Sequence, residues 1–77
     1  MHDVKIYSTP TCHFCHMAKE FFQEKGVQYT EYDVLSDLAK RQEMVEKSGQ
    51  LGVPVIIIDN KVVIGFDQGE ISSLLGI

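Results

Sequence analysis

The sequence predicts an α/β fold with the element order β-α-β-α-β-β-α, in which a four-stranded mixed sheet is flanked by three helices. Two observations predict this fold. Strand-like alternation gives way to helical spacing of apolar residues early in the chain, and the chain closes with a hairpin followed by a short helix. A β-α-β unit followed by such a hairpin and helix forms one mixed sheet covered by helices. Because the chain has 77 residues, we expect residues 1–77 to form one domain around a single compact core.

The first elements are a strand, a loop and a helix. Residues 4–7 alternate and predict a strand, and residues 8–11 form a loop. A helix is expected from about Cys12 to Lys25, because its apolar residues are spaced three and four apart, and Gly26 ends it as a left-handed cap. These apolar residues are Phe14, Met17, Ala18, Phe21 and Phe22.

The middle of the chain predicts a strand and a second helix. Residues 27–34 are rich in β-branched and aromatic side chains, as is typical of a strand. Ser36 can cap a helix that continues to about Lys47, and the charged residues between positions 40 and 47 are expected to form a solvated face of it. The apolar face of this helix is thin and consists of Leu38, Met44 and Val45.

The last elements are a hairpin and a helix. Residues 53–58 form a continuous apolar strand, and Asp59 and Asn60 provide a tight turn into a strand at residues 61–64. Asp67 starts a final helix with a capping-box pattern. That helix carries Glu70 at the second capping-box position and Ile71, Leu74 and Leu75 on its apolar face.

Composition and charge exclude several classes of function. The 11 acidic and 7 basic residues give a formal net charge of −4, which argues against nucleic-acid binding because such domains need a basic surface. No apolar run approaches the roughly 18 residues of a membrane span. The N-terminal sequence also lacks the basic and apolar regions of a secretory signal. We therefore expect a monomeric cytoplasmic protein that binds neither nucleic acid nor a membrane.

The two cysteines, Cys12 and Cys15, form a C-x-x-C motif where the loop enters the first helix. In a cytoplasmic α/β chain this motif is typical of a redox-active dithiol. Attack on a disulfide requires a thiolate, and the unpaired amides and partial positive charge of a helix N-terminus stabilise one. The helix dipole contributes about 0.3–1 kcal/mol, and about 2 kcal/mol in a partly buried geometry, which lowers the pKa of the Cys12 thiol by roughly one unit. Cys12 is therefore the predicted nucleophile.

The neighbours of Cys12 have expected roles as well. Cys15 should face the interior one turn further along the helix and resolve the mixed disulfide formed at Cys12. His13 is the candidate cation that lowers the pKa of Cys12 further, and the two groups would titrate as a coupled pair. His16 is expected to be a residue of the helix surface.

Val53-Pro54 is a second candidate element of the site. A proline at the start of an apolar strand cannot donate to a ladder, and it suits a cis peptide bond at a turn. If the bond is cis, the backbone of Val53 is free to pair with an extended peptide or with glutathione. If it is trans, Pro54 only begins the strand. The residues leave both alternatives open.

Three segments together resemble the glutaredoxin family in order and spacing over essentially the whole chain. They are YSTPTCHFCH at residues 7–16, Gly52-Val53-Pro54, and Gly65-Phe66-Asp67. The resemblance implies a thioredoxin-like fold of the glutaredoxin type, with Cys12 as nucleophile, Cys15 as resolving thiol and a cis Pro54. It also implies a thiol–disulfide oxidoreductase that reduces protein or glutathione mixed disulfides, with glutathione as its reductant and disulfide-containing proteins as its partners.

The resemblance further implies a groove for glutathione. Val53 would pair with the backbone of the tripeptide, and the Phe66 amide and Asp67 would hold its γ-glutamyl end. A helix N-terminus at Asp67 favours the α-carboxylate of that end, and the Asp67 side chain favours its ammonium. The residues implied for this groove are Phe14, Val53, Pro54, Gly65, Phe66 and Asp67.

The chain departs from the usual glutaredoxin pattern around this groove. His13-Phe14 stands where the family usually carries Pro-Tyr, Thr9 where many members have a lysine, and Gln50 where a basic residue is often found. Two cationic contacts to the glycyl carboxylate, which the family pattern implies, are therefore not expected from these residues. At about 0.5–2 kcal/mol each, their loss lowers the expected affinity for glutathione by about one or two decades.

Three other interpretations of the cysteines and their reductant compete with this one. The first is a zinc site, which we do not expect, because adjacent helical residues point about 100° apart and the side chains of four residues near one helix end cannot all converge on one ion. The four residues are Cys12, His13, Cys15 and His16. The cysteines could instead hold an iron–sulfur cluster shared between two chains, as in some glutaredoxins. The reductant could be a thioredoxin-reductase-like flavoenzyme, although redoxins of that type usually have a tryptophan-containing C-terminal motif and this chain has no tryptophan.

Overall fold

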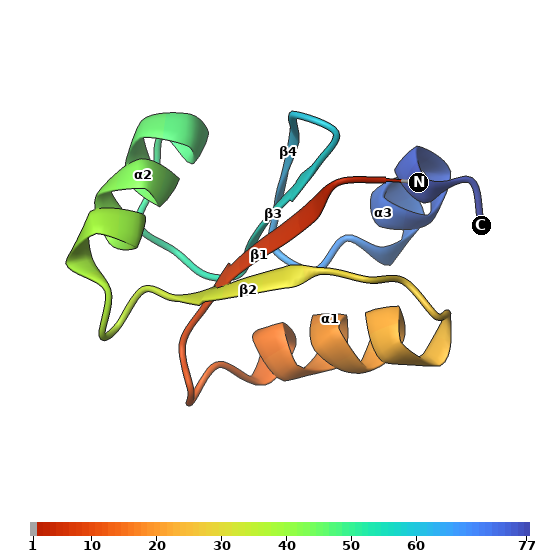
Figure 1. The fold of residues 1–77 in the computed structure, drawn as a ribbon, viewed down its shortest axis with the longest axis horizontal. Coiled ribbons are helices and arrows are strands. Elements are labelled where there is room, and N and C mark those ends of the chain that lie inside the picture. Colours follow the sequence, from red (N-terminus) through yellow and green to blue (C-terminus); the bar gives the residue numbers. More distant parts are fainter. Residues whose placement is uncertain (1) are drawn as a thin grey trace.

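The computed structural model describes residues 2–77, so Met1 of the expected domain lies outside the described residues. The order of elements along the chain is the predicted one (Figure 1). The elements are β1 (Val4–Ser8), α1 (His13–Glu24), β2 (Thr30–Asp33), α2 (Leu38–Ser48), β3 (Val55–Ile58), β4 (Lys61–Ile64) and α3 (Gln68–Leu75).

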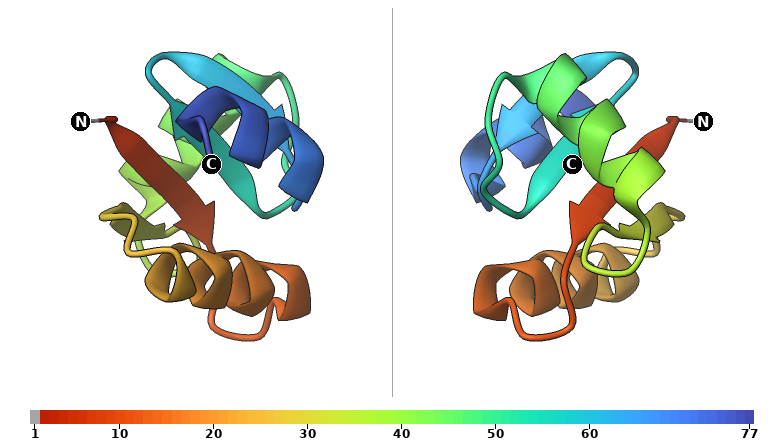
Figure 2. Two further views of the ribbon diagram at one scale, coloured as in Figure 1. Left: turned by 90° about the vertical axis from the view of Figure 1, so that its right-hand side faces the viewer. Right: turned by 90° about the vertical axis from the view of Figure 1, so that its left-hand side faces the viewer.

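The four strands form one mixed sheet in the order β2-β1-β3-β4. β1 runs parallel to β2 and antiparallel to β3, and β3 runs antiparallel to β4. Helices α1 and α3 cover one face of the sheet and α2 covers the other (Figures 1 and 2). The predicted fold class, a four-stranded mixed sheet flanked by three helices, is confirmed.

The core consists of two clusters because successive strand residues point to opposite faces. Ile6 packs with Phe22 of α1 and Ile71 of α3 on one face, whereas Tyr7 packs with Met44 of α2 on the other. The continuous apolar run of β3 has the same explanation. All four of its residues are buried because helices cover both faces of this central strand.

Gly26, the Asp59-Asn60 turn and the Asp67 cap lie where the sequence predicts them. Gly26 follows α1 with a φ of 68°, and Asp59 and Asn60 have φ values of 50° and 70° in the turn between β3 and β4. The Asp67 carboxylate accepts a hydrogen bond from the Glu70 amide at 3.1 Å at the start of α3. None of the helices in the described residues has both the length and the apolar character that a membrane span requires.

Several element boundaries differ from the prediction. The apolar strand expected at residues 53–58 begins only at Val55, because the cis Val53–Pro54 bond lies in the loop before it and Pro54 cannot donate to the ladder. The second strand begins only at Thr30, because the amide of Val27 bonds to the Phe22 carbonyl at 2.8 Å and so completes the end of α1. The cap of α2 is Asp37 rather than Ser36. The Asp37 carboxylate accepts from the Lys40 amide at 3.1 Å, which is the bond that an N-cap side chain makes.

The charged residues of α2 were expected to form a solvated face, and Arg41, Glu46 and Lys47 are indeed exposed, but Lys40 and Glu43 make contacts with the sheet. Glu43 accepts a hydrogen bond from the buried hydroxyl of Tyr7 and pairs with the Lys40 ammonium at 3.0 Å. The same ammonium lies 4.2 Å from the centre of the Tyr32 ring. The face of α2 toward the sheet therefore holds a charge cluster that packs on two tyrosines.

Candidate active site

The sheet brings three loops to one edge. Tyr7 pairs with Val55 across the antiparallel β1–β3 ladder, so the loop that follows Ser8 lies beside the loop that precedes β3. The amide of Gly65 bonds to the carbonyl of Pro54 at 2.9 Å, which places the β4–α3 connection next to the same loop. Strand pairing therefore brings three segments together at this edge: the Cys12 loop, Val53-Pro54 and the Gly65–Asp67 segment.

Cys12 is the N-cap residue of α1 and is partly exposed. Its sulfur accepts a hydrogen bond from the backbone amide of Cys15 at 3.1 Å. In most helices an oxygen-bearing side chain accepts this bond from one of the first amides. Here a sulfur takes that place, so the helix N-terminus directs both an N–H group and its partial positive charge at Cys12.

Cys15 is fully buried in the first turn of α1. The Cα atoms of Cys12 and Cys15 are 5.2 Å apart, and their sulfurs form a disulfide. The two residues therefore differ as expected, since Cys12 is partly exposed and Cys15 is enclosed by the core. The structure represents the oxidised form of the dithiol.

His13 and Phe14 are both exposed at the start of α1. Their rings pack edge to face with centroids 5.4 Å apart. No hydrogen bond joins the His13 ring to either cysteine within residues 2–77. His13 thus lies at the same helix end as Cys12, but its ring contacts Phe14 and not the sulfur that it was expected to influence.

The expected glutathione groove takes its residues from the two other loops. The Val53–Pro54 peptide bond is cis, and Pro54 is fully buried while Val53 is half-buried. Phe66 is half-buried and packs edge to face on Phe21 of α1, with ring centroids 5.8 Å apart. Asp67 is exposed, and one of its oxygens already serves as the cap of α3.

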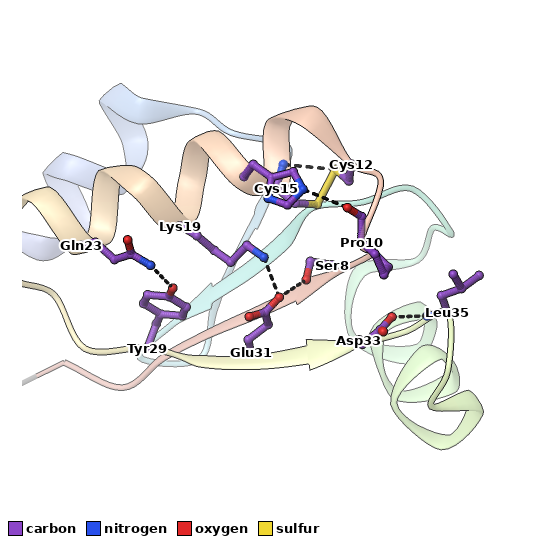
Figure 3. A network of polar contacts seen from close by, with 11 residues as sticks. Ser8, Pro10, Cys12, Cys15, Lys19, Gln23, Tyr29, Glu31, Asp33 and Leu35 are labelled. Atoms are coloured by element: carbon purple, nitrogen blue, oxygen red, sulfur yellow. Dashed lines mark hydrogen bonds and ion pairs between the residues drawn. A yellow bond between two sulfur atoms is a disulfide. The ribbon is translucent and has the colours of Figure 1, made fainter.

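A polar network of Ser8, Lys19 and Glu31, which the sequence does not predict, lies below the cysteines in the view of Figure 3. The buried Ser8 hydroxyl donates to Oε2 of Glu31 at 3.0 Å, and the Lys19 ammonium donates to the same oxygen at 2.7 Å. These hydrogen bonds, above all the one from Lys19, hold the pKa of the Glu31 carboxyl below its ordinary value. The available signal was the position of Lys19, which lies four residues after Cys15 on the apolar side of α1.

His16 was expected to be only a surface residue, and it is exposed. Its ring nitrogen Nε2, however, lies 2.9 Å from the carbonyl oxygen of Pro10 in the loop before Cys12. Nothing in the sequence alone indicates this contact, because it depends on how the loop folds back over the first turn of α1.

The described residues contain no candidate metal site. Within residues 2–77, no group of three or more histidine, cysteine, aspartate or glutamate side chains is arranged so that it could hold a metal ion.

Comparison with known proteins places this geometry in a family. The family model named Glutaredoxin matches residues 4–63. Glutaredoxin 3 of Escherichia coli strain K12 is 42% identical over 68 residues, which cover 88% of this chain and 82% of that protein. An uncharacterised glutaredoxin-like 8.6 kDa protein of the rubredoxin operon of Clostridium pasteurianum is 43% identical over 94% of this chain and 96% of its own.

Solved structures agree with this result. The crystal structure of the thioredoxin-like protein BC3987 superposes with a TM-score of 0.88 at 32% identity, over 94% of this chain and 99% of that chain. A glutaredoxin from Archaeoglobus fulgidus has the same fold, with a TM-score of 0.87 at 24% identity, over 97% of this chain and 87% of its own. With its paired Cys12 and Cys15 at the start of α1, the chain belongs to the glutaredoxin family and is a thiol–disulfide oxidoreductase.

Proposed function

We propose that Cys12 attacks the disulfide of a protein or glutathione mixed disulfide, that Cys15 resolves the product, and that glutathione restores the dithiol. The observation that carries the proposal is the 3.1 Å hydrogen bond from the Cys15 amide to the sulfur of the partly exposed Cys12. An N–H group aimed at a sulfur on a helix N-terminus favours the thiolate, which is the attacking species.

The exchange proceeds in two steps on the substrate. The Cys12 thiolate forms a bond to one substrate sulfur, and the other substrate sulfur leaves as a thiolate that takes a proton from water. Cys15 then loses its proton and attacks the Cys12 sulfur, which releases the second substrate thiol and leaves the Cys12–Cys15 disulfide. Burial suits Cys15 to this second step, because an enclosed sulfur meets Cys12 before it meets solvent.

Glutathione returns the protein to its reduced form. One glutathione thiolate attacks the Cys12 sulfur and frees Cys15, and a second glutathione attacks the resulting mixed disulfide, which yields glutathione disulfide and the Cys12 thiolate. The partners would then be glutathione and disulfide-containing proteins, in the cytoplasm, where thiols are kept reduced.

Backbone geometry beside the cysteines supports glutathione as the reductant. Neither the amide nor the carbonyl of Val53 bonds to another backbone group within residues 2–77, so both can pair with an extended tripeptide. Asp67 keeps one carboxylate oxygen beyond its capping bond, and this oxygen can accept from the γ-glutamyl ammonium. Phe14 and Phe66 supply apolar contact area near the cysteines.

A side-by-side reduction assay tests the proposal. One mixed disulfide is reduced by this protein with glutathione and glutathione reductase in one arm, and with thioredoxin reductase in the other, both driven by NADPH. We expect turnover in the glutathione arm that is lost in the Cys12→Ser variant. Turnover only with thioredoxin reductase would reject glutathione as the reductant.

A charge variant tests the groove itself. Gln50→Lys restores a basic residue where many glutaredoxins have one, and it should lower the KM for glutathione by about threefold to tenfold, as one charged hydrogen bond would. Gln42→Lys adds the same charge on the exposed surface of α2 and serves as the matched control. If both variants change KM equally, Gln50 does not lie in a glutathione groove.

A further inference from the structure

We propose that His16 is a positioning residue for the reaction. Its imidazole holds the carbonyl of Pro10 and thereby fixes the loop that carries Cys12, so that the Cys12 sulfur stays in front of the Cys15 amide. The proposal rests on the proposed role of Cys12 and adds a residue to it.

The loop before Cys12 has few other attachments. Pro10 and Thr11 are exposed, and within the described residues one backbone hydrogen bond closes the loop, from the Cys12 amide to the Thr9 carbonyl at 3.3 Å. Proline has no N–H group, so Pro10 can be held by its backbone only through its carbonyl. The Pro10 carbonyl is therefore one of the few points at which this loop can be held.

His16 supplies this contact from a rigid element. Its Nε2 lies 2.9 Å from the Pro10 carbonyl oxygen, and Figure 3 shows the dashed line that ends on Pro10 beside the disulfide. The His16 amide also bonds to the Cys12 carbonyl at 3.2 Å. His16 therefore contacts the chain on both sides of Thr11: its ring contacts the carbonyl of Pro10, and its amide contacts the carbonyl of Cys12.

The chemistry of imidazole makes the contact independent of its charge. Because a carbonyl can only accept, Nε2 must carry a proton, and it does so in the imidazolium and in one neutral tautomer. The contact can therefore form in the charged ring and in the neutral ring that carries its proton on Nε2. This separates the proposal from an electrostatic role, in which only the cationic form would stabilise the thiolate.

Loss of the contact should weaken thiolate stabilisation at Cys12. With the loop freer, the Cys12 sulfur spends less time within reach of the Cys15 amide, and the thiolate loses part of the hydrogen bond that favours it. The thiol pKa then rises, and the fraction of thiolate at neutral pH falls. A hydrogen bond between exposed groups is modest, so the effect should be several-fold rather than complete.

Alkylation of the reduced protein tests this inference. The rate of iodoacetamide modification of Cys12 is followed by mass spectrometry against pH in the natural protein and in His16→Ala, His16→Gln and Glu24→Ala. We expect His16→Ala to raise the midpoint by about half a pH unit, which is about threefold in thiolate. His16→Gln keeps a side-chain N–H donor without a charge and should restore most of the difference, and Glu24→Ala, on the exposed surface at the far end of α1, should change nothing.

The outcomes separate the possible explanations. A midpoint in His16→Ala equal to that of the natural protein would overturn the positioning role. Equal effects of Ala and Gln would overturn it in favour of a charge effect. A midpoint near 8.5 in the natural protein itself would reject thiolate stabilisation at Cys12, which is a failure of the proposed function and not of His16 alone.

Discussion

The hydroxyl of Tyr7 donates a hydrogen bond to Oε1 of Glu43 at 2.7 Å and so joins the central strand β1 to α2. Tyr7 is fully buried, and a buried hydroxyl needs such a partner. Burial, and then the Glu43 carboxylate, raises the pKa of Tyr7 far above its ordinary value. In return the Tyr7 hydroxyl, followed by the Lys40 ammonium, lowers the pKa of Glu43 to about 2.

This pair should contribute measurably to stability. Glu43→Ala leaves the Tyr7 hydroxyl buried without a partner, and we expect it to cost about 1–3 kcal/mol in the free energy of unfolding in urea. Tyr7→Phe removes the hydroxyl, and with it the buried group that requires a partner. Glu43→Ala should therefore lower the free energy of unfolding by less in the Tyr7→Phe background than in the natural protein. Glu46→Ala, on the exposed side of α2, is the control. Additive effects of the two changes would show that the hydrogen bond contributes nothing.

The low pKa of Glu43 predicts an acid-sensitive step in stability. The folded carboxyl titrates near 2 and the unfolded one near its ordinary 4.5, so the unfolded chain binds the proton more tightly. The stabilisation is therefore complete above about pH 4.5 and is lost as pH falls toward 2. Urea midpoints measured across this window should fall less in Glu43→Gln than in the natural protein. Parallel pH profiles would contradict the assignment.

Sequence patterns predicted most of the fold because this chain obeys local rules. The apolar spacing of α1, the unbroken apolar run of β3 and the Asp59-Asn60 turn each have one structural solution. Prediction failed where two adjacent residues compete for one role. Ser36 and Asp37 can both cap a helix, and only the path of the chain after β2 decides that Asp37 does so.

The site was predictable to the extent that it lies in one stretch of sequence. The C-x-x-C spacing located both sulfurs and the buried position of Cys15. Contacts between distant residues were not predictable. The Tyr7–Glu43 bond spans 36 positions, and the bond from Ser8 to Glu31 spans 23. These pairings follow from strand register and helix placement, which no local pattern contains.

Cys12 should have a thiol pKa clearly below that of a free cysteine, because the Cys15 amide and the N-terminus of α1 both favour its thiolate. The ultraviolet absorbance of the thiolate, titrated in the Cys15→Ser variant, measures Cys12 alone. We expect a midpoint at least about one unit below 8.5. A midpoint at 8.5 would leave the hydrogen bond without chemical effect.

His13 should add a smaller contribution. It lies next to Cys12 at the start of α1, where an imidazolium would favour the thiolate through space although its ring packs on Phe14. His13→Ala should therefore raise the thiol pKa of Cys12 by a fraction of a unit. The effect should weaken in high salt, because exposed charges are screened. An unchanged pKa in low salt would show that His13 is only a surface residue.

The two cysteines should differ sharply when each is replaced by serine. Cys12→Ser removes the sulfur of the partly exposed cysteine, so every disulfide reduction should stop. Cys15→Ser leaves the nucleophile and its amide donor in place, because the donor is a backbone group. This variant should form a mixed disulfide with a protein substrate and fail to resolve it, yet glutathione can still release a glutathionyl group from Cys12.

Intact-protein mass spectrometry detects the trapped adduct, and a glutathione-coupled assay measures the remaining turnover. Activity in Cys12→Ser together with an inactive Cys15→Ser would reverse the two roles, and it would require the enclosed sulfur to meet substrate before the exposed one.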